Sequence, residues 1–186
     1  MAQEQSRLDQ ETVSIEIVYI SAQSLLYTLL LFSMIGFTWR ADNFFWFFYF
    51  ICMCFIYFVL YGMMIVALTP NHDIAGIVSF FFITLWNLFA GFLVFRPLIP
   101  VWWRWYYWAS PVAWTIYGVM TSQLGDKENL VEIPGEASST VKAYLKDNLG
   151  YKHSFLGYVA LAHAGFVLVF SFVFGYSIKF LNFQKR

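Results

Sequence analysis

The sequence predicts an all-α integral membrane protein with four transmembrane helices and a re-entrant aromatic external loop. Hydrophobic residues make up 60% of the 186 residues and charged residues only 12%, whereas a soluble domain carries about a quarter of charged residues. Four apolar segments each approach the roughly 20 residues that a helix needs to cross a bilayer. The third segment leads into a stretch of tryptophans, tyrosines and prolines. The formal net charge of zero offers no basic field to nucleic acid.

The chain begins with a polar segment, residues 1–14, which lacks the basic-then-apolar order of a signal peptide. We expect a cytosolic lead-in here, followed by a membrane domain over residues 15–186. The first predicted span covers residues 17–37. Glu16 stands at its entrance, where a carboxylate meets the positive end of the helix dipole and stays hydrated.

The second predicted span, residues 44–68, carries no charge and is rich in aromatic side chains. Asp42 or Asn43 is expected to cap it, because a short side-chain oxygen accepts from the free amides of a first helical turn. Cys52 and Cys54 face different directions on a helix. This favours core residues over a disulfide or a metal site.

A polar turn with Pro70 ends the second span and contains His72 and Asp73. This pair is the most catalytic-looking dyad of the chain, but no serine, cysteine or third ligand stands in the turn. A helix-capping turn is therefore favoured over chemistry.

In the third predicted span, residues 74–95, Thr84 and Asn87 are the polar members that we single out. A carboxamide at membrane depth needs a partner in the protein or a water-filled path. Two interpretations stay open for Asn87: a hydrogen bond to another helix, or the lining of a cavity. Gly76 and Gly91 would allow close helix contact.

An external loop, residues 96–154, opens with an aromatic stretch. Indole and phenol rings have an apolar body and one polar atom, so they settle at headgroup depth. The prolines of the stretch each remove a backbone donor and stop a helix from running straight through. The sequence therefore predicts short helices that dip or lie flat at the outer face. The stretch contains Trp102, Trp103, Trp105, Tyr106, Tyr107 and Trp108 around Arg104.

The loop ends in a soluble-looking part, residues 125–153. Its pattern predicts a short amphipathic helix over residues 140–148, with Ser138 and Ser139 as the cap. The apolar stripe of this helix needs a cover, so we expect a folded external cap.

The fourth predicted span, residues 155–180, contains His163. No intramembrane carboxylate accompanies it, so a neutral, hydrogen-bonded helix contact is favoured over a proton relay. Four spans place both termini on one side of the membrane. The basic residues Lys179, Lys185 and Arg186 favour the cytosol for that side.

Six motifs stand out along the chain. They are SMIGF at residues 33–37, ALTPNHDIAGIVS at 67–79, WNLFAGF at 86–92, IPVWWRWYYWASPVAWTIYG at 99–118, SQLGD at 122–126 and FLNFQKR at 180–186. Together they resemble the C-terminal membrane half of plant pleiotropic-drug-resistance transporters, full-size members of the G subfamily of ABC transporters. The resemblance covers nearly everything from residue 15 onward and excludes residues 1–12. The chain departs from the family pattern at Val18, Phe95 and Leu98.

The resemblance implies that the chain carries spans three to six of a six-span ABC-2 type transmembrane domain. In such transporters, ATP hydrolysis at paired cytosolic nucleotide domains drives amphipathic or apolar small molecules out through a central cavity. The span at residues 74–95 would line that cavity, with Thr84 and Asn87 facing it. Phe92 and Leu93 would form an apolar valve below the external exit. The external roof would consist of Trp102, Trp103, Arg104, Trp105, Tyr106 and Tyr107.

The sequence lacks the G-x-x-x-x-G-K-S/T loop that cradles nucleotide phosphates. We therefore expect no enzyme activity and no cofactor in this chain, while ATP and Mg would belong to the full-length parent. The expected partners are the lipid bilayer, the remaining transporter half with its nucleotide-binding domains, and an amphipathic small-molecule substrate. The resemblance implies the plasma membrane as the location.

One alternative stays open: a truncated, non-transporting membrane protein that associates with intact transporters and modulates them. The polar lead-in and the missing nucleotide-binding motif fit that hypothesis. An intramembrane enzyme that uses His72, Asp73 or His163 is disfavoured, because these groups stand alone or at the ends of different spans.

Overall fold

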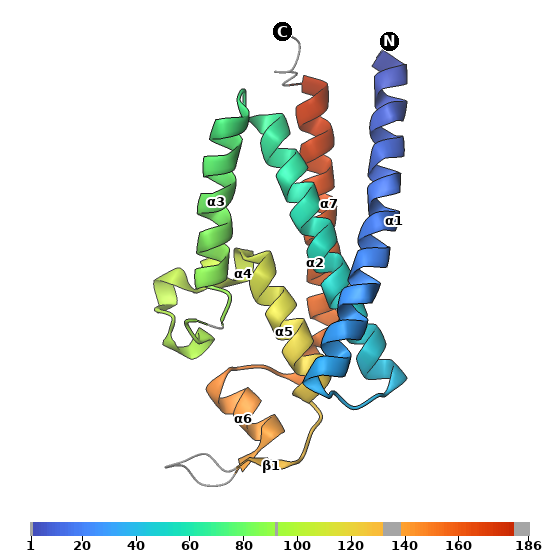
Figure 1. Ribbon diagram of the computed structural model, residues 1–186. Coiled ribbons are helices and arrows are strands. Elements are labelled where there is room, and N and C mark those ends of the chain that lie inside the picture. Colours follow the sequence, from blue (N-terminus) through green and yellow to red (C-terminus); the bar gives the residue numbers. More distant parts are fainter. Residues whose placement is uncertain (1, 92, 132–138, 181–186) are drawn as a thin grey trace.

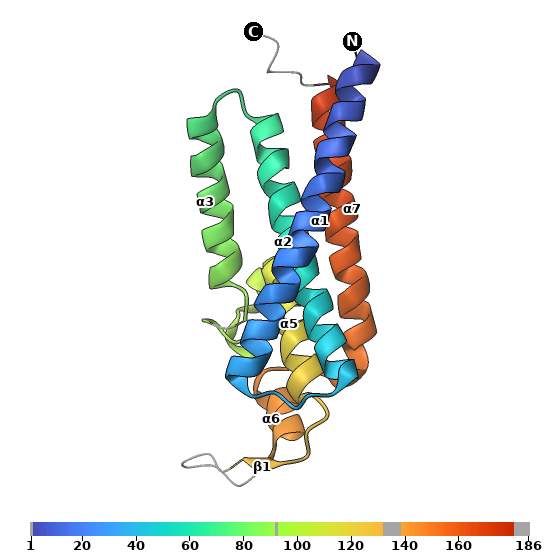
Figure 2. The same cartoon turned by 45° about the vertical axis from the view of Figure 1, so that its right-hand side comes forward.

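Helices that run side by side make up most of the computed structural model, which describes residues 2–91, 93–131 and 139–180. The start of α1 and the end of α7 lie at one end of the bundle, and α6 lies at the other (Figures 1 and 2). The α-helices are α1 (Ala2–Ile35), α2 (Ala41–Leu68), α3 (His72–Leu88), α4 (Arg104–Ala109), α5 (Pro111–Leu124), α6 (Val141–Asn148) and α7 (Leu156–Phe180).

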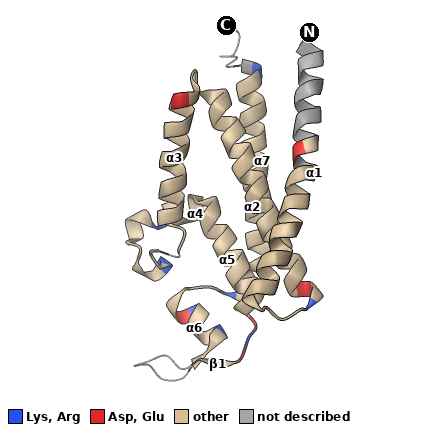
Figure 3. Cartoon of the chain, viewed as in Figure 1, with Lys and Arg blue, Asp and Glu red and all other residues tan. Residues whose placement is uncertain are grey.

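Three helical segments of the described residues are long and apolar enough to cross a membrane: Val18–Ile35, Ala41–Leu68 and His153–Lys179. The apolar helix α3 has 17 residues and is shorter than the other three. Figure 3 shows that α2, α3 and the described part of α7 carry charge only near their ends. The all-α membrane class is confirmed, apart from two short strands, whereas the number of four spans stays a prediction.

The helix α5 packs beside the pair formed by α2 and α7, contacts both, and completes the core of the bundle (Figure 1). It begins at Pro111, where a missing amide proton costs nothing, and the Ser110 side chain accepts from the backbone amide of Ala113. The fully buried Phe50 of α2 packs directly against Gly118 of α5. The two helices approach so closely because residue 118 has no side chain.

A second part of the core is aromatic and joins α2, α3 and α7. The rings of Tyr61 and Trp86 lie 4.7 Å apart, centroid to centroid, and Trp86 stacks on Phe170 at 6.2 Å. All three side chains are buried. Trp86 is the main side chain through which α3 joins this core.

A chain of polar side chains crosses the centre of the bundle. His163 of α7 is fully buried, with Nε2 2.9 Å from Thr115 Oγ1 and Nδ1 3.1 Å from the Val159 carbonyl oxygen. Since a carbonyl only accepts, Nδ1 carries the proton and Nε2 accepts from the Thr115 hydroxyl. The Tyr57 hydroxyl lies 3.2 Å from Thr115 Oγ1, and Cys54 Sγ donates to Tyr57. The predicted hydrogen-bonded helix contact of His163 is confirmed, and its partner is α5.

The predicted caps are wrong at the level of single residues. Arg40, not Asp42 or Asn43, is the N-cap of α2 and makes no side-chain cap bond. Asn43 instead donates to Thr38 Oγ1, because it already lies inside the helix. Thr140 caps α6 by accepting from the amide of Ala143. Ser139 lies one residue too early for that bond, and Ser138 lies outside the described residues.

The turn before α3 carries no constellation for chemistry. His72 and Asp73 are exposed and form the first turn of the helix. Among the described residues, no three His, Cys, Asp or Glu side chains gather as metal ligands. Asn71 occupies the N-cap position without a side-chain bond.

The part of the chain that is predicted to be external forms a small cap below the bundle (Figure 1). Strands β1 (Leu130–Val131) and β2 (Ser139–Thr140) pair antiparallel and lead into α6. Leu145 of α6 is buried against a cluster that contains Tyr117 and Tyr151, with Val141 and Leu149 beside it. The end of α5 and the segment after α6 therefore cover the apolar stripe of α6.

Candidate functional site

One face of α3 has no packing partner among the described residues. The inner face carries the buried Ala75 and Trp86, which pack against α2, α5 and α7. The opposite face is exposed along its length, and Phe80 there has 73% of its surface exposed. The exposed side chains of this outer face are Ile77, Phe80, Phe81, Thr84, Asn87 and Leu88.

Thr84 and Asn87 lie one helical turn apart on the outer face of α3. Asn87 Nδ2 donates to the Ile83 carbonyl oxygen of its own helix at 2.8 Å. This bond anchors the carboxamide without another helix. The outer face is thus amphipathic, since two polar groups stand among phenylalanine and aliphatic side chains.

The helix α3 ends at Leu88, so the predicted span 74–95 is helical for only part of its length. Gly91 adopts a left-handed backbone with φ of +87°, which favours glycine and stops a helix. A Cβ at this position would lie 3.1 Å from both the Tyr107 ring and the Tyr151 hydroxyl. Leu93 follows with 66% of its surface exposed, and Phe92 lies outside the described residues.

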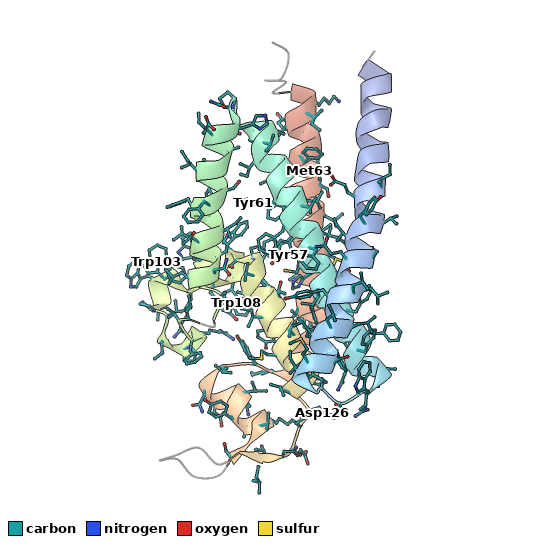
Figure 4. The ribbon with its side chains drawn as sticks, in the orientation of Figure 1. Tyr57, Tyr61, Met63, Trp103, Trp108 and Asp126 are labelled. Carbon is teal, nitrogen blue, oxygen red and sulfur yellow. The ribbon has the colours of Figure 1, made fainter. Side chains whose placement is uncertain are left out.

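The aromatic stretch folds back beneath the end of α3 as two 3-10 turns, Arg96–Leu98 and Val101–Trp103, followed by α4. Trp103 stacks on Phe89 with ring centroids 5.4 Å apart. Tyr106 meets the same ring edge to face at 5.4 Å. Figure 4 shows Trp103 on the side of this fold that is remote from α5, and Trp108 on the side of α5.

The predicted roof residues therefore divide into two groups. Trp103, Tyr106 and the buried Tyr107 pack inward. Trp102, Arg104 and Trp105 are exposed, and Arg104 Nε donates to the Ile99 carbonyl oxygen at 3.3 Å. The outward group forms an apolar surface with one cation.

Tyr107 of the inward group and Tyr151 of the predicted external part both lie against Gly91. Burial raises the pKa of Tyr107, and the neighbouring Tyr151 adds to the shift. Burial also raises the pKa of Tyr151. Both phenols are therefore neutral near pH 7 and pack as uncharged rings and hydroxyls.

Comparison with known families identifies the fold. Residues 12–124, more than half of the chain, match the ABC-2 type transporter family. The chain belongs to this family. Its match includes α2, α3, the aromatic stretch and α5, so the outer face of α3 is a surface of an ABC-2 type membrane domain.

Curated relatives resemble nearly the whole chain. Pleiotropic drug resistance protein 2 of Nicotiana plumbaginifolia is 61% identical over 175 residues, and ABC transporter G family member 34 of Arabidopsis thaliana is 56% identical over 174 residues. ABC transporter G family member 48 of Oryza sativa subsp. japonica is 56% identical over 172 residues. The matches cover 92–94% of this chain but 12% of each relative. This ABC-2 type chain thus spans a small part of the length of its relatives.

Two sets of contacts in this ABC-2 type domain were not predicted from the sequence. One is the polar chain from Cys54 to His163. The other is the set of contacts that Gly91 and Arg96 make with the predicted external part. The chain does change character at Arg96 and Pro97, but the Gly150 carbonyl oxygen that Arg96 binds stands 54 residues away.

Proposed function

We propose that this chain forms the substrate-path part of an ATP-driven exporter of amphipathic or apolar small molecules. The outer face of α3 carries the argument. Polar side chains on a membrane helix need a protein partner or water, and Thr84 and Asn87 face away from the other described helices. A water-filled path would satisfy the polar groups, while the phenylalanines beside them would contact the apolar part of a substrate.

The exit of this path would lie at the end of α3. The exposed Leu93 stands just beyond the left-handed turn at Gly91. Together with Phe92 it would form an apolar valve that blocks water and yields to an amphipathic substrate. The roof would be the aromatic stretch, with Trp102 and Trp105 facing the outside and Arg104 as its cation.

The energy for transport would come from elsewhere in the full-length protein. The chain covers 12% of the length of its relatives, and two of those relatives are named as ABC transporters. We therefore propose nucleotide-binding domains that hold ATP and Mg as the partner of this membrane domain. Lys179 near the end of α7 supports a cytosolic position for the start of α1 and the end of α7, which lie at the same end of the bundle. The plasma membrane is the proposed location.

Cysteine accessibility tests the path in a full-length transporter that carries this segment and lacks other reactive cysteines. We expect a water-soluble thiol reagent to label Thr84→Cys and Asn87→Cys, and an amphipathic substrate to slow that labelling. Leu168→Cys on α7 is the control, since it is 70% exposed in this chain but would face lipid. Labelling of all three positions at one rate, or protection of none, would contradict the proposal.

The same outer face also fits the alternative of a non-transporting partner. In that case α3 would dock against an intact transporter instead of lining a path. Co-purification of an intact transporter with the short chain, together with thiol positions that stay unlabelled in the complex, would favour this second function.

A further inference from the structure

Arg96 connects the segment after α3 with the external part of the chain. Its guanidinium carbon lies 4.6 Å from the centroid of the Trp108 ring, and Nη1 donates to the Gly150 carbonyl oxygen at 3.3 Å. A guanidinium stacks well on an indole and still donates from its edge. The guanidinium group of Arg96 therefore contacts α4 with its face and residue 150 with its edge.

Gly91 provides a second connection between the same two regions. Its left-handed backbone leaves room for Tyr107 of α4 and Tyr151 of the external part, each of which would lie 3.1 Å from a Cβ there. Tyr151 is buried. The turn that ends α3 is thus packed directly against the residue next to Gly150.

Residues 150–152 are in turn fixed to α6 and to α5. The Tyr151 amide donates to the Leu145 carbonyl oxygen at 2.9 Å, and the Lys152 amide donates to the Tyr117 hydroxyl at 2.8 Å. Leu145 is itself buried. Any shift of residues 150–151 therefore acts on α6 through a backbone bond.

The Arg96 link differs from an ion pair. Among the described residues, the two ion pairs within 4.0 Å are Arg40–Asp42 and Lys142–Asp126, and neither involves Arg96. Its contacts are a ring face and a neutral carbonyl, which depend on direction and distance more than a charge pair does. A small displacement of either region breaks them.

We propose that Arg96, together with Gly91 and Tyr151, couples the external cap around α6 to residues 93–99. These residues form the segment that closes the end of α3. The role of that segment as an exit rests on the proposed function. Opening it moves Arg96 away from Trp108 and Gly150 and frees Tyr151, so the cap around α6 loosens in the same step. Arg96 is a positioning residue that contacts no substrate.

Hydrogen exchange of the whole chain in lipid nanodiscs tests the coupling. We expect Arg96→Gln to speed amide exchange on the order of fivefold to tenfold, both at residues 93–99 and at residues 144–152. Arg104→Gln is the matched control, because its bond to Ile99 is local and should leave residues 144–152 unchanged. Faster exchange of Arg96→Gln at residues 93–99 alone would overturn the proposal.

A second variant approaches the link from the other side. Gly150 has φ of +72°, and a Cβ there would lie 3.5 Å from Arg96 Nη1. The Cβ itself would make only an ordinary contact, but alanine is strained in this left-handed conformation. Relief of that strain shifts the carbonyl that Arg96 binds, so Gly150→Ala should speed exchange at residues 93–99. Gly36→Ala carries the same backbone strain, with φ of +72° and nothing within 4 Å of the added Cβ, and should not. Equal exchange at residues 93–99 in both variants would contradict the coupling.

Two further controls make the exchange result interpretable. Protection of α2 and α7 must stay unchanged, and if Arg96→Gln lowers it, Arg96→Lys replaces that variant because it keeps the cation and loses the planar stack. The exchange experiment requires no transport. Coupled exchange without substrate protection of Thr84→Cys would leave the coupling standing and remove only the proposed function.

Discussion

The core of α2, α5 and α7 differs from the outer face of α3 in its packing and in its hydrogen-bond partners. In the core, Phe50 fills the space over Gly118, and His163 and Thr115 satisfy each other's hydrogen bonds. On α3, Thr84 is exposed and Asn87 bonds to its own helix. Tyr57, Thr115 and His163 each have a side-chain partner on another helix, whereas the side chains of Thr84 and Asn87 on the outer face have no hydrogen-bond partner on another described helix.

This difference indicates that the core is fixed in one position, whereas the outer face of α3 is available for contact with another molecule. Close packing and interhelical hydrogen bonds hold a membrane helix in one position. A helix that joins the bundle through one face, mainly through Trp86, presents its other face to whatever lies beside it. The three substitutions below test this division, from the largest expected effect on stability to the smallest.

The largest effect is expected for Gly118→Ala. The added Cβ would lie 2.4 Å from the Phe50 ring, and an extra carbon in a well-packed core costs about 1–3 kcal/mol. The change should lower the resistance of the purified chain to unfolding by heat or by SDS, followed by circular dichroism.

Gly62→Ala is the matched control for this prediction. Gly62 lies in α2 with nothing within 4 Å of the added Cβ, so the change should be neutral or stabilise the helix by up to about 1 kcal/mol. Two equal losses of stability would contradict the close approach of α2 and α5.

A smaller effect is expected for Thr115→Val. The change removes the hydroxyl that lies 2.9 Å from His163 Nε2 and 3.2 Å from the Tyr57 hydroxyl. Hydrogen bonds between membrane helices contribute on average about 0.6 kcal/mol and up to about 1.7 kcal/mol. We expect a loss of about 1–2 kcal/mol in the same unfolding assay, because two buried partners lose one group.

Thr28→Val controls for the loss of a hydroxyl as such. Thr28 of α1 is fully buried, and its Oγ1 has no hydrogen-bond partner among the described residues. Replacing that hydroxyl with a methyl group should cost nothing or stabilise the chain. A loss at Thr28 as large as that at Thr115 would show that the polar chain contributes no specific stability.

The sequence predicted the elements whose signals are local. The apolar run of the second span and Pro70 placed the end of α2 correctly at Leu68. Residues 111–124 were predicted as part of a loop with short helices, so α5, which packs against α2 and α7 in the core, was missed. The end of α3 was predicted at residue 95 because the apolar composition continues beyond Leu88. The helix stops earlier since Gly91 is held by Tyr107 and Tyr151.

The site was predictable in part for the same reason. The pattern picked out Thr84 and Asn87 as the polar members of an apolar helix, and their exposure on α3 follows from the helical period. The partner of His163 stands 48 residues away on α5, and that of Arg96 stands 54 residues away. Such pairs depend on how the helices pack, which the pattern of one segment does not contain.

The smallest effect on stability is expected for Asn87→Leu on the outer face of α3. The Asn87 side chain bonds only to the Ile83 carbonyl oxygen among the described residues, so its loss should change the free energy of unfolding by less than about 0.5 kcal/mol. In a full-length transporter that carries this segment, the same change should lower efflux of an amphipathic substrate roughly threefold to tenfold, since one polar group of the path is lost. If the outer face of α3 acts separately from the core, Thr115→Val should have the larger effect on unfolding and Asn87→Leu the larger effect on efflux. Unchanged efflux in a stable Asn87→Leu protein would instead remove this residue from the path.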